Sequence, residues 1–353
     1  MPIDRNAVAA EIAVTIADYR QGEIAPPNRE HVLRWIDQFD AATRDGILVE
    51  TQNLLARSYI PKPFVEKFIN MLANTEKLVG PDPRVFWSGV GFLNMQRRSQ
   101  SQRDMLALLS AVLTTRYGLG CEREKSLNGS YVYIDDAIFS GNQVRGDVQQ
   151  WIEQTDARNC HIHVIVIGWH KRGQWYANKQ LRAICSPRSI RMTWWKLGEI
   201  EDWKKPETNA SVAVLWPTHA PNDQYIQNWF RLSPRDLEFF TPRPALQPPL
   251  QNSNFTSEAG RVLLEQAFMQ RGAFIASLPR NHDPHMHPLG YQSLNGPGFG
   301  TLFATYRNCP NNCPLVLWWG DPDAGRPLNQ WYPLLPRRTR AQNWAADFDE
   351  VDF

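Results

Sequence analysis

The chain has 353 residues, 42% of them hydrophobic, and its 38 basic and 36 acidic residues leave a formal net charge of +2. Such a chain holds one large or two medium-sized globular domains, and its near-neutral charge excludes bulk electrostatic binding of nucleic acid, leaving only local basic loops. No apolar run is long enough to cross a bilayer, residues 1–20 lack a signal-peptide core, and the five cysteines have no disulfide-scaffold spacing, so we expect a cytoplasmic protein.

Residues 1–80 are expected to form a helical cap, because apolar residues recur at helical spacing over 7–19, 29–43 and 62–73. Residues 81–217 instead alternate strand and helix patterns, which predicts an α/β domain with a mostly parallel sheet flanked by helices. The predicted strands cover 90–96, 131–134, 160–168 and 189–197, and the predicted helices cover 102–117, 143–154 and 172–185.

A polar, basic loop follows the first of these strands. It contains Arg97, Arg98 and Ser99, and the planar fork of arginine binds phosphate oxygens in pairs. A solvated basic turn explains the same residues equally simply. A second polar segment, residues 118–129, carries Arg123 and Lys125 and has the composition of an exposed loop.

The stretch from Tyr131 to Val144 is the most informative part of the chain. Asp135 and Asp136 follow an apolar strand, and small residues around Gly141 open the next helix. Ligands of open α/β sheets bind at the carboxyl ends of strands, and a helix N-terminus attracts phosphate. Two carboxylates beside a phosphate cradle suit a ribose 5-phosphate. Helix capping is the structural alternative, although burying two neighbouring acids without a ligand is costly.

The C-terminal third has a less regular pattern. Residues 218–256 are rich in proline and are expected to form a linker or surface arm. Residues 257–353 are expected to form an irregular α+β region that packs on the core, with a helix over 257–271. Short β-like runs within 295–319, including the apolar run 314–319, predict a hairpin or added strands.

Histidine and cysteine positions raise the alternative of a metal site. His161 and His163 alternate along one predicted strand, which is more typical of a half-buried strand face than of metal ligands. A zinc site is a rival use of the C-terminal region, although Cys-x3-Cys is not a standard zinc spacing. Its candidate ligands are His282, Asp283, His285, His287, Cys309 and Cys313.

Residues 131–143 resemble the fingerprint of the type I phosphoribosyltransferases, which is four apolar residues, two acids, three variable residues, Thr or Ser, Gly, any residue and Thr. Only the last position departs, because Gln143 replaces Thr. The resemblance implies a phosphoribosyltransferase-like sheet in which Asp135 and Asp136 hold the ribose hydroxyls of phosphoribosyl pyrophosphate or a related nucleotide. The implied 5-phosphate loop consists of Phe139, Ser140, Gly141, Asn142 and Gln143.

The same resemblance implies roles for the two polar segments upstream. Arg97, Arg98 and Ser99 take the place of the loop that holds pyrophosphate, and residues 118–129 that of a mobile catalytic hood. The implied cofactor is Mg²⁺, held chiefly by oxygens of the ligand and water. The reaction would be phosphoribosyl transfer, or transfer or hydrolysis at a nucleotide glycosyl bond.

A narrower similarity is to phosphoribosyltransferase-like proteins of bacterial conflict systems, including those encoded beside retron reverse transcriptases. It rests on FLNMQRRSQSQRDM, VYIDDAIFSGNQV, GFGTLFATYRNCPNNCPLVLWW and WYPLLPR. It implies an antiphage effector that works with a partner protein, or with a nucleoprotein of reverse transcriptase and its DNA or RNA. A catalytically inactive nucleotide-sensing or scaffold subunit is the alternative. A nuclease that uses Asp135 and Asp136 as metal ligands lacks further acids at suitable spacing.

Overall fold

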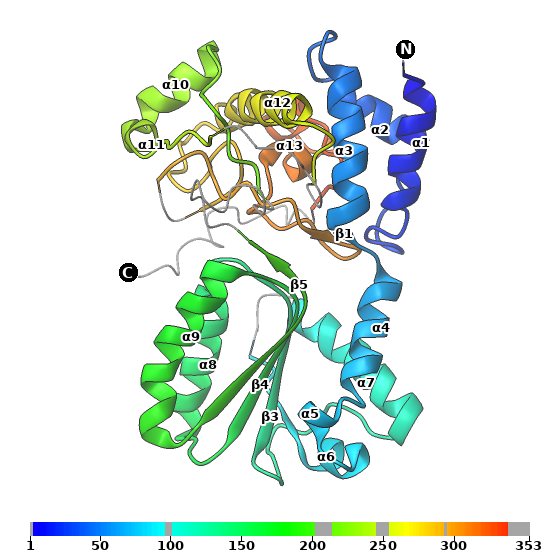
Figure 1. Ribbon diagram of the computed structural model, residues 1–353, viewed down its shortest axis with the longest axis vertical. Helices are drawn as coiled ribbons and strands as arrows, with labels where there is room; N and C mark the ends of the chain where they lie inside the picture. Colours follow the sequence, from blue (N-terminus) through cyan, green and yellow to red (C-terminus); the bar gives the residue numbers. More distant parts are fainter. Residues whose placement is uncertain (1–2, 96–100, 202–213, 245–253, 293–294, 338–353) are drawn as a thin grey trace. The chain divides into compact units, whose positions relative to one another are not determined.

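The computed structural model describes residues 3–95, 101–201, 214–244, 254–292 and 295–337 (Figure 1). The chain forms two compact units. Residues 60–213 form the sheet unit, and residues 1–59 together with 214–353 form the helical unit. This division differs from the four segments expected from composition, because the predicted helix over 62–73 belongs to the sheet unit. No helix in the described part of the chain is long and apolar enough to span a membrane.

The sheet unit is built on four parallel strands in the order β2-β3-β4-β5. The two central strands pair over most of their length, with Tyr133 opposite Val164 and Asp135 opposite Val166. Their apolar runs suit strands that are covered on both faces. The expected fold class, a parallel sheet flanked by helices, is confirmed. The strands are β2 (Gly91–Phe92), β3 (Ser130–Ile138), β4 (His161–His170) and β5 (Arg191–Ile200).

Helices cover both faces of this sheet (Figure 1). On one face lie α8 (Asn142–Thr155) and α9 (Lys171–Cys185), whose apolar residues pack with alternate residues of β3 and β4. The buried helix residues on this face include Val148, Ile152 and Leu181. The helices of the other face are α4 (Lys62–Leu72), α5 (Glu76–Val79), α6 (Pro83–Gly89) and α7 (Ser101–Tyr117), and the 3-10 turn η1 (Ser186–Arg188) precedes β5.

The predicted elements of the sheet unit are confirmed, but the end of β3 is not where it was expected. The strand continues past the acids, because Ala137 pairs with Gly168 and Ile138 pairs with Trp169 in the ladder with β4. Asp135 and Asp136 therefore lie inside the strand rather than after it. The strand predicted over 90–96 is limited to two residues in its described part.

The helical unit has an aromatic core. The Trp35 and Phe39 ring centroids lie 5.2 Å apart, and Phe39 also contacts Phe268 and Trp331 at 5.9 and 5.5 Å. The helices are α1 (Arg5–Thr15), α2 (Arg29–Ile36), α3 (Arg44–Ser58), α10 (Gln224–Leu232), α11 (Pro234–Glu238), α12 (Glu258–Ala276) and α13 (Leu315–Trp318), with short elements β1 (Tyr59–Ile60), β6 (Ala304–Thr305) and η3 (Leu328–Gln330).

Three parts of this unit differ from what the sequence indicated. The apolar run 314–319, expected as a strand, instead contains α13, because a short buried apolar run is compatible with either structure. Within residues 218–256, expected as a linker or arm, α10 and α11 form, and the Asp223 side chain caps α10. The helix α3 was not predicted.

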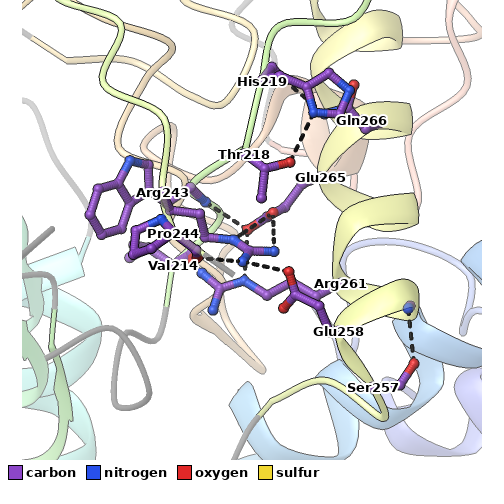
Figure 2. A network of polar contacts seen from close by, with 12 residues as sticks. Val214, Thr218, His219, Arg243, Pro244, Ser257, Glu258, Arg261, Glu265 and Gln266 are labelled. Carbon is purple, nitrogen blue, oxygen red and sulfur yellow. Dashed lines mark hydrogen bonds and ion pairs between the residues drawn. The ribbon is translucent and has the colours of Figure 1, made fainter. Parts of the chain in front are cut away.

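A buried network of ion pairs joins α12 to the segments before α10 and after α11 (Figure 2). Oxygens of Glu265 lie 2.9 Å from Arg243 and 2.7 Å from Arg261, and Glu265 also accepts a hydrogen bond from the Trp216 backbone N–H at 3.0 Å. Arg243 also pairs with Glu258 at 2.9 Å. The side chains of Arg243, Arg261 and Glu265 are at most 1% exposed. Two buried cations are thus balanced by the buried Glu265 and by the partly exposed Glu258, as buried charges require.

Candidate functional site

The two acids of β3 lie near the carboxyl end of the strand and point to opposite faces of the sheet, because successive strand residues alternate. Asp135 is buried on the face that α8 and α9 cover, and Asp136 is half-buried. The Asp136 backbone N–H donates to Oδ1 of Asp135 at 2.8 Å, and the Ala137 N–H donates to Oδ1 of Asp136 at 2.7 Å. These bonds hold each carboxylate against its own strand.

A third carboxylate, Asp147 of α8, joins the site. The Tyr133 hydroxyl lies 2.7 Å from Oδ2 of Asp147 and 3.3 Å from Oδ2 of Asp135, so it lies between the two acids. Asp147 was not among the residues predicted from the sequence. Its position in α8 could have indicated it. Asp147 lies three residues after the buried Val144 and next to the buried Val148, so the helical spacing places this acid toward the sheet.

The turn of residues 139–141 carries the chain from β3 into α8. Gly141 has a left-handed backbone, with φ of 83°, which glycine adopts at low cost. The Ser140 hydroxyl accepts a hydrogen bond from the Asn142 N–H at 3.3 Å. The first N–H groups of a helix have no intrahelical acceptor and carry the positive end of its dipole. The first turn of α8 has no acidic residue to neutralise that end.

The start of α9 packs closely against the turn of residues 139–141. The contact involves one glycine on each side, Gly173 in α9 and Gly141 in the turn. A Cβ on Gly173 would overlap the Phe139 carbonyl oxygen, and a Cβ on Gly141 would overlap the Gly173 carbonyl oxygen. The two backbones therefore approach more closely than any other residue pair would allow. The predicted 5-phosphate residues Phe139, Ser140, Gly141, Asn142 and Gln143 thus lie in this turn and at the start of α8, with Gln143 exposed.

Comparison with models of protein families assigns the chain to a family. The model of the family PRTase-CE matches residues 32–337 of the 353-residue chain. The chain belongs to the PRTase-CE family. The match includes both units and confirms the phosphoribosyltransferase-like assignment that residues 131–143 indicated. No curated protein and no solved structure matches the chain.

In this PRTase-CE protein a second polar cluster lies at the same edge of the sheet, where β4 and β5 end. Trp169 Nε1 donates to Glu199 at 2.8 Å, and Lys171 Nζ lies 3.8 Å from Glu199 and 3.1 Å from Glu201. Lys196 pairs with Glu199 and lies 4.7 Å from the centre of the Trp169 ring. Partial burial raises the pKa of Glu199, but the bonds from Lys196 and Trp169 outweigh it and the pKa lies below its usual value. This cluster was not predicted from the sequence.

The predicted pyrophosphate residues Arg97, Arg98 and Ser99 lie outside the described residues. Just before these residues in the chain, the Met95 N–H donates to the side chain of the buried Gln102 in α7 at 2.7 Å. Met95 is therefore tied to the first turn of α7.

Residues 118–129, expected as a hood, pass along the outer edge of β2. The Phe92 N–H donates to the Arg123 carbonyl at 2.7 Å, and the Leu127 N–H donates to the Gly89 carbonyl at 2.7 Å. Two open cavities of about 380 and 290 Å³ adjoin this segment. Both are lined by Glu122, and the smaller one also by Arg103, Cys121 and Glu124. In this structure the segment therefore covers a sheet edge.

The proposed zinc ligands do not converge in the described part of the chain, where no three His, Cys, Asp or Glu side chains form a group that could hold a metal ion. His282 Nε2 instead lies 2.9 Å from the Ser233 hydroxyl, and His287 Nδ1 lies 3.2 Å from Asp236. On the sheet, the rings of His161 and His163 contact each other with centroids 4.0 Å apart and planes tilted by 37°. Each of these four histidines therefore contacts another side chain of the protein.

Proposed function

We propose that this PRTase-CE protein binds phosphoribosyl pyrophosphate or a related nucleotide at the carboxyl end of β3. One observation carries the proposal. Within eight residues the chain places two acids, a left-handed glycine turn and the N-terminus of a helix without first-turn acids. The acids suit ribose hydroxyls, and the turn suits a phosphate, because backbone N–H groups and the helix dipole favour an anion there.

In this proposal Asp135 and Asp136 accept hydrogen bonds from the ribose hydroxyls and stabilise positive charge at the anomeric carbon. Tyr133, which lies between Asp135 and Asp147, orients the buried acid. The bond from the anomeric carbon to a pyrophosphate oxygen breaks, and a bond to an acceptor nitrogen, or to a water oxygen, forms. Pyrophosphate leaves with the electron pair. Positioning and charge stabilisation are the protein's contribution.

The remaining roles rest on the residues of the polar loop and on the ligand. Arg97, Arg98 and Ser99 are proposed to bind the departing pyrophosphate, since paired guanidinium donors match phosphate oxygens. Mg²⁺ fits the donor chemistry of this edge, because half-buried Asp136 offers hard carboxylate oxygens and the ligand offers phosphate oxygens. When bound, the ion would neutralise charge on the leaving group.

Calorimetry with phosphoribosyl pyrophosphate and Mg²⁺ tests this site. The double variant Asp135→Asn with Asp136→Asn removes two charged acceptors, so we expect affinity to fall about 10-fold to 100-fold. The matched control is Glu153→Gln with Asp156→Asn, which removes two exposed acids at the far end of α8 and should leave binding unchanged. Equal affinity of the site variant and the wild-type protein contradicts the proposal.

A second candidate function, a nucleotide-sensing or scaffold subunit without turnover, is favoured by Gln143. Its side chain is exposed at the first turn of α8, in the position where the fingerprint has a phosphate-binding Thr. Binding without pyrophosphate release over long incubation with mixed bases would support this subunit. Release of pyrophosphate that depends on Asp135 and Asp136 would support the enzyme.

We further propose that the protein is an effector of a bacterial antiphage defence system, which acts with a partner protein or a reverse-transcriptase nucleoprotein. The similarity of the segments around Asp135 and Cys309 to conflict-system proteins supports this role. Phage plating on cells with the wild-type gene and its genomic neighbours tests it. Protection that is lost with Asp135→Asn and Asp136→Asn is expected, and equal plating with and without the wild-type gene contradicts it.

A further inference from the structure

Basic and acidic residues are segregated along the second half of the sheet unit. Between Asp156 and Glu199 the chain has eight Lys or Arg residues and no Asp or Glu, although the whole chain has 38 basic and 36 acidic residues. The eight are Arg158, Lys171, Arg172, Lys179, Arg182, Arg188, Arg191 and Lys196. This stretch therefore concentrates positive charge within a nearly neutral protein.

The helix α9 presents part of this charge as one exposed row. Arg172, Trp175, Lys179 and Arg182 are exposed and follow one another at steps of three, four and three residues, which places them on one helix face. The opposite face packs on the sheet through Ala177 and other apolar residues. The row from Arg172 to Arg182 is about 15 Å long, at about 1.5 Å per residue.

The cations of this row are not used to hold the fold together. Lys171 and Lys196 nearby pair with Glu199, and Arg158 pairs with Asp156. In contrast, within the residues that the structure describes, no acidic side chain pairs with Arg172, Lys179 or Arg182.

Trp175 is unusual among the tryptophans of this protein. Its side chain is 57% exposed, and no other tryptophan in the described ranges is among the exposed large apolar residues. Lys179 Nζ lies 5.2 Å from the centre of its ring, so the indole and this cation lie side by side. An exposed indole within a row of cations is a feature of surfaces that stack bases and track phosphates.

We infer that the outward face of α9 binds single-stranded nucleic acid. Arg172, Lys179 and Arg182 contact successive phosphates, and Trp175 stacks on an unpaired base. A straight row of cations matches a linear polyanion, and the guanidinium fork suits phosphate oxygens. A single strand is favoured over a duplex because a duplex hides the base faces that an indole needs. The inference does not depend on the phosphoribosyl site.

Fluorescence anisotropy with the full chain and labelled oligonucleotides of about 20 nucleotides, both DNA and RNA, tests this surface. Replacing Arg172, Lys179 and Arg182 by Gln should weaken binding at least about tenfold, and the slope of log affinity against log salt should lose about 2, at about 0.7 per phosphate contact. Trp175→Ala should weaken binding about 5-fold to 100-fold, and Trp175→Phe should restore most of it.

The matched control replaces three exposed cations elsewhere in the sheet unit, Lys67, Lys77 and Arg84, by Gln. It should leave affinity within about twofold, since none of these lies on α9. Three results overturn the inference. The first is that the wild-type protein does not bind the oligonucleotides at about 0.05 M salt. The second is that the control variant loses as much affinity as the α9 triple variant. The third is that the α9 triple variant keeps the wild-type affinity. Competition by polyglutamate together with full affinity of Trp175→Ala would identify an acidic protein surface as the ligand instead.

Discussion

Charged side chains occupy the two units of this protein in different ways. Around α12 in the helical unit, Arg243, Arg261 and Glu265 are almost fully excluded from solvent, and each charge is matched by an opposite one (Figure 2). At the carboxyl end of β3 in the sheet unit, Asp136 and Asp147 are half-buried, beside a helix N-terminus.

The difference separates a stabilising role from a binding role. Arg243, Arg261 and Glu265 are inaccessible to solvent, so we expect them to act on the free energy of unfolding rather than on ligand binding. Asp136 and Asp147 are partly accessible to solvent, so a ligand can reach them, whereas Asp135 beside them is buried. Stability and ligand affinity should therefore respond to different substitutions.

The largest expected effect is on the interior network. Glu265→Gln leaves two buried guanidinium groups with one carboxylate, and the free energy of unfolding should fall by about 3–5 kcal/mol. Urea denaturation of the full chain measures this loss. Glu258→Gln, whose side chain is 30% exposed, is the control and should cost clearly less. Equal losses in the two variants would show that burial does not set the cost.

The corresponding change near the carboxyl end of β3 is Gly173→Ala, in the first turn of α9. The new methyl group would overlap the Phe139 carbonyl oxygen and push the turn of residues 139–141 away from α9. We expect a loss of about 1–3 kcal/mol in the free energy of unfolding, typical of overpacking. We also expect weaker binding of phosphoribosyl pyrophosphate in calorimetry. A stable variant with unchanged ligand affinity would show that the close approach does not shape the site.

The parts of the site that are local in sequence could be predicted, and those that depend on distant contacts could not. The apolar run of β3, the acids and the glycine turn lie within one short stretch, so their pattern indicates strand, turn and helix directly. Gly173 is different. In the sequence it is a lone glycine in a helical pattern, which only weakens the helix, and its reason becomes visible when Phe139 is beside it.

The interior network gave no sequence signal for the same reason. Arg243 and Glu265 are separated by 22 residues, and part of the intervening chain was expected to be irregular. At residues 314–319 the prediction was wrong for a different reason. This short apolar run was assigned to a strand but contains the helix α13. Periodicity cannot distinguish these structures over so few residues.

A buried group without a matching charge allows a test by pH. His163 is 3% exposed and accepts a hydrogen bond from Trp195 at 3.3 Å. Burial, followed by His161 and Arg191, lowers the pKa of His163 to about 3. Below pH of about 6.5 the unfolded chain binds a proton that the folded chain does not, so stability should fall as pH decreases from there toward about 3.

Between pH of about 7.5 and 5 this histidine should account for a loss of about 2 kcal/mol, at about 1.4 kcal/mol per pH unit below 6.5. Urea titrations at both pH values measure it. In His163→Gln, which keeps an acceptor for Trp195, the loss should shrink by that amount. His219→Gln, an exposed site, should keep the wild-type dependence. A variant at position 163 that loses as much stability as the wild-type protein contradicts the assignment.

The smallest expected effect, that of Gly146→Ala, has the opposite sign to that of Gly173→Ala. Gly146 lies inside α8, where a Cβ would meet nothing within 4 Å. Gly146→Ala should therefore raise the free energy of unfolding by about 0.5–1 kcal/mol, since alanine loses less backbone entropy in a helix. Ligand affinity should not change. Denaturation and calorimetry on both glycine variants then show whether close backbone approach, rather than glycine itself, is what the turn after β3 requires.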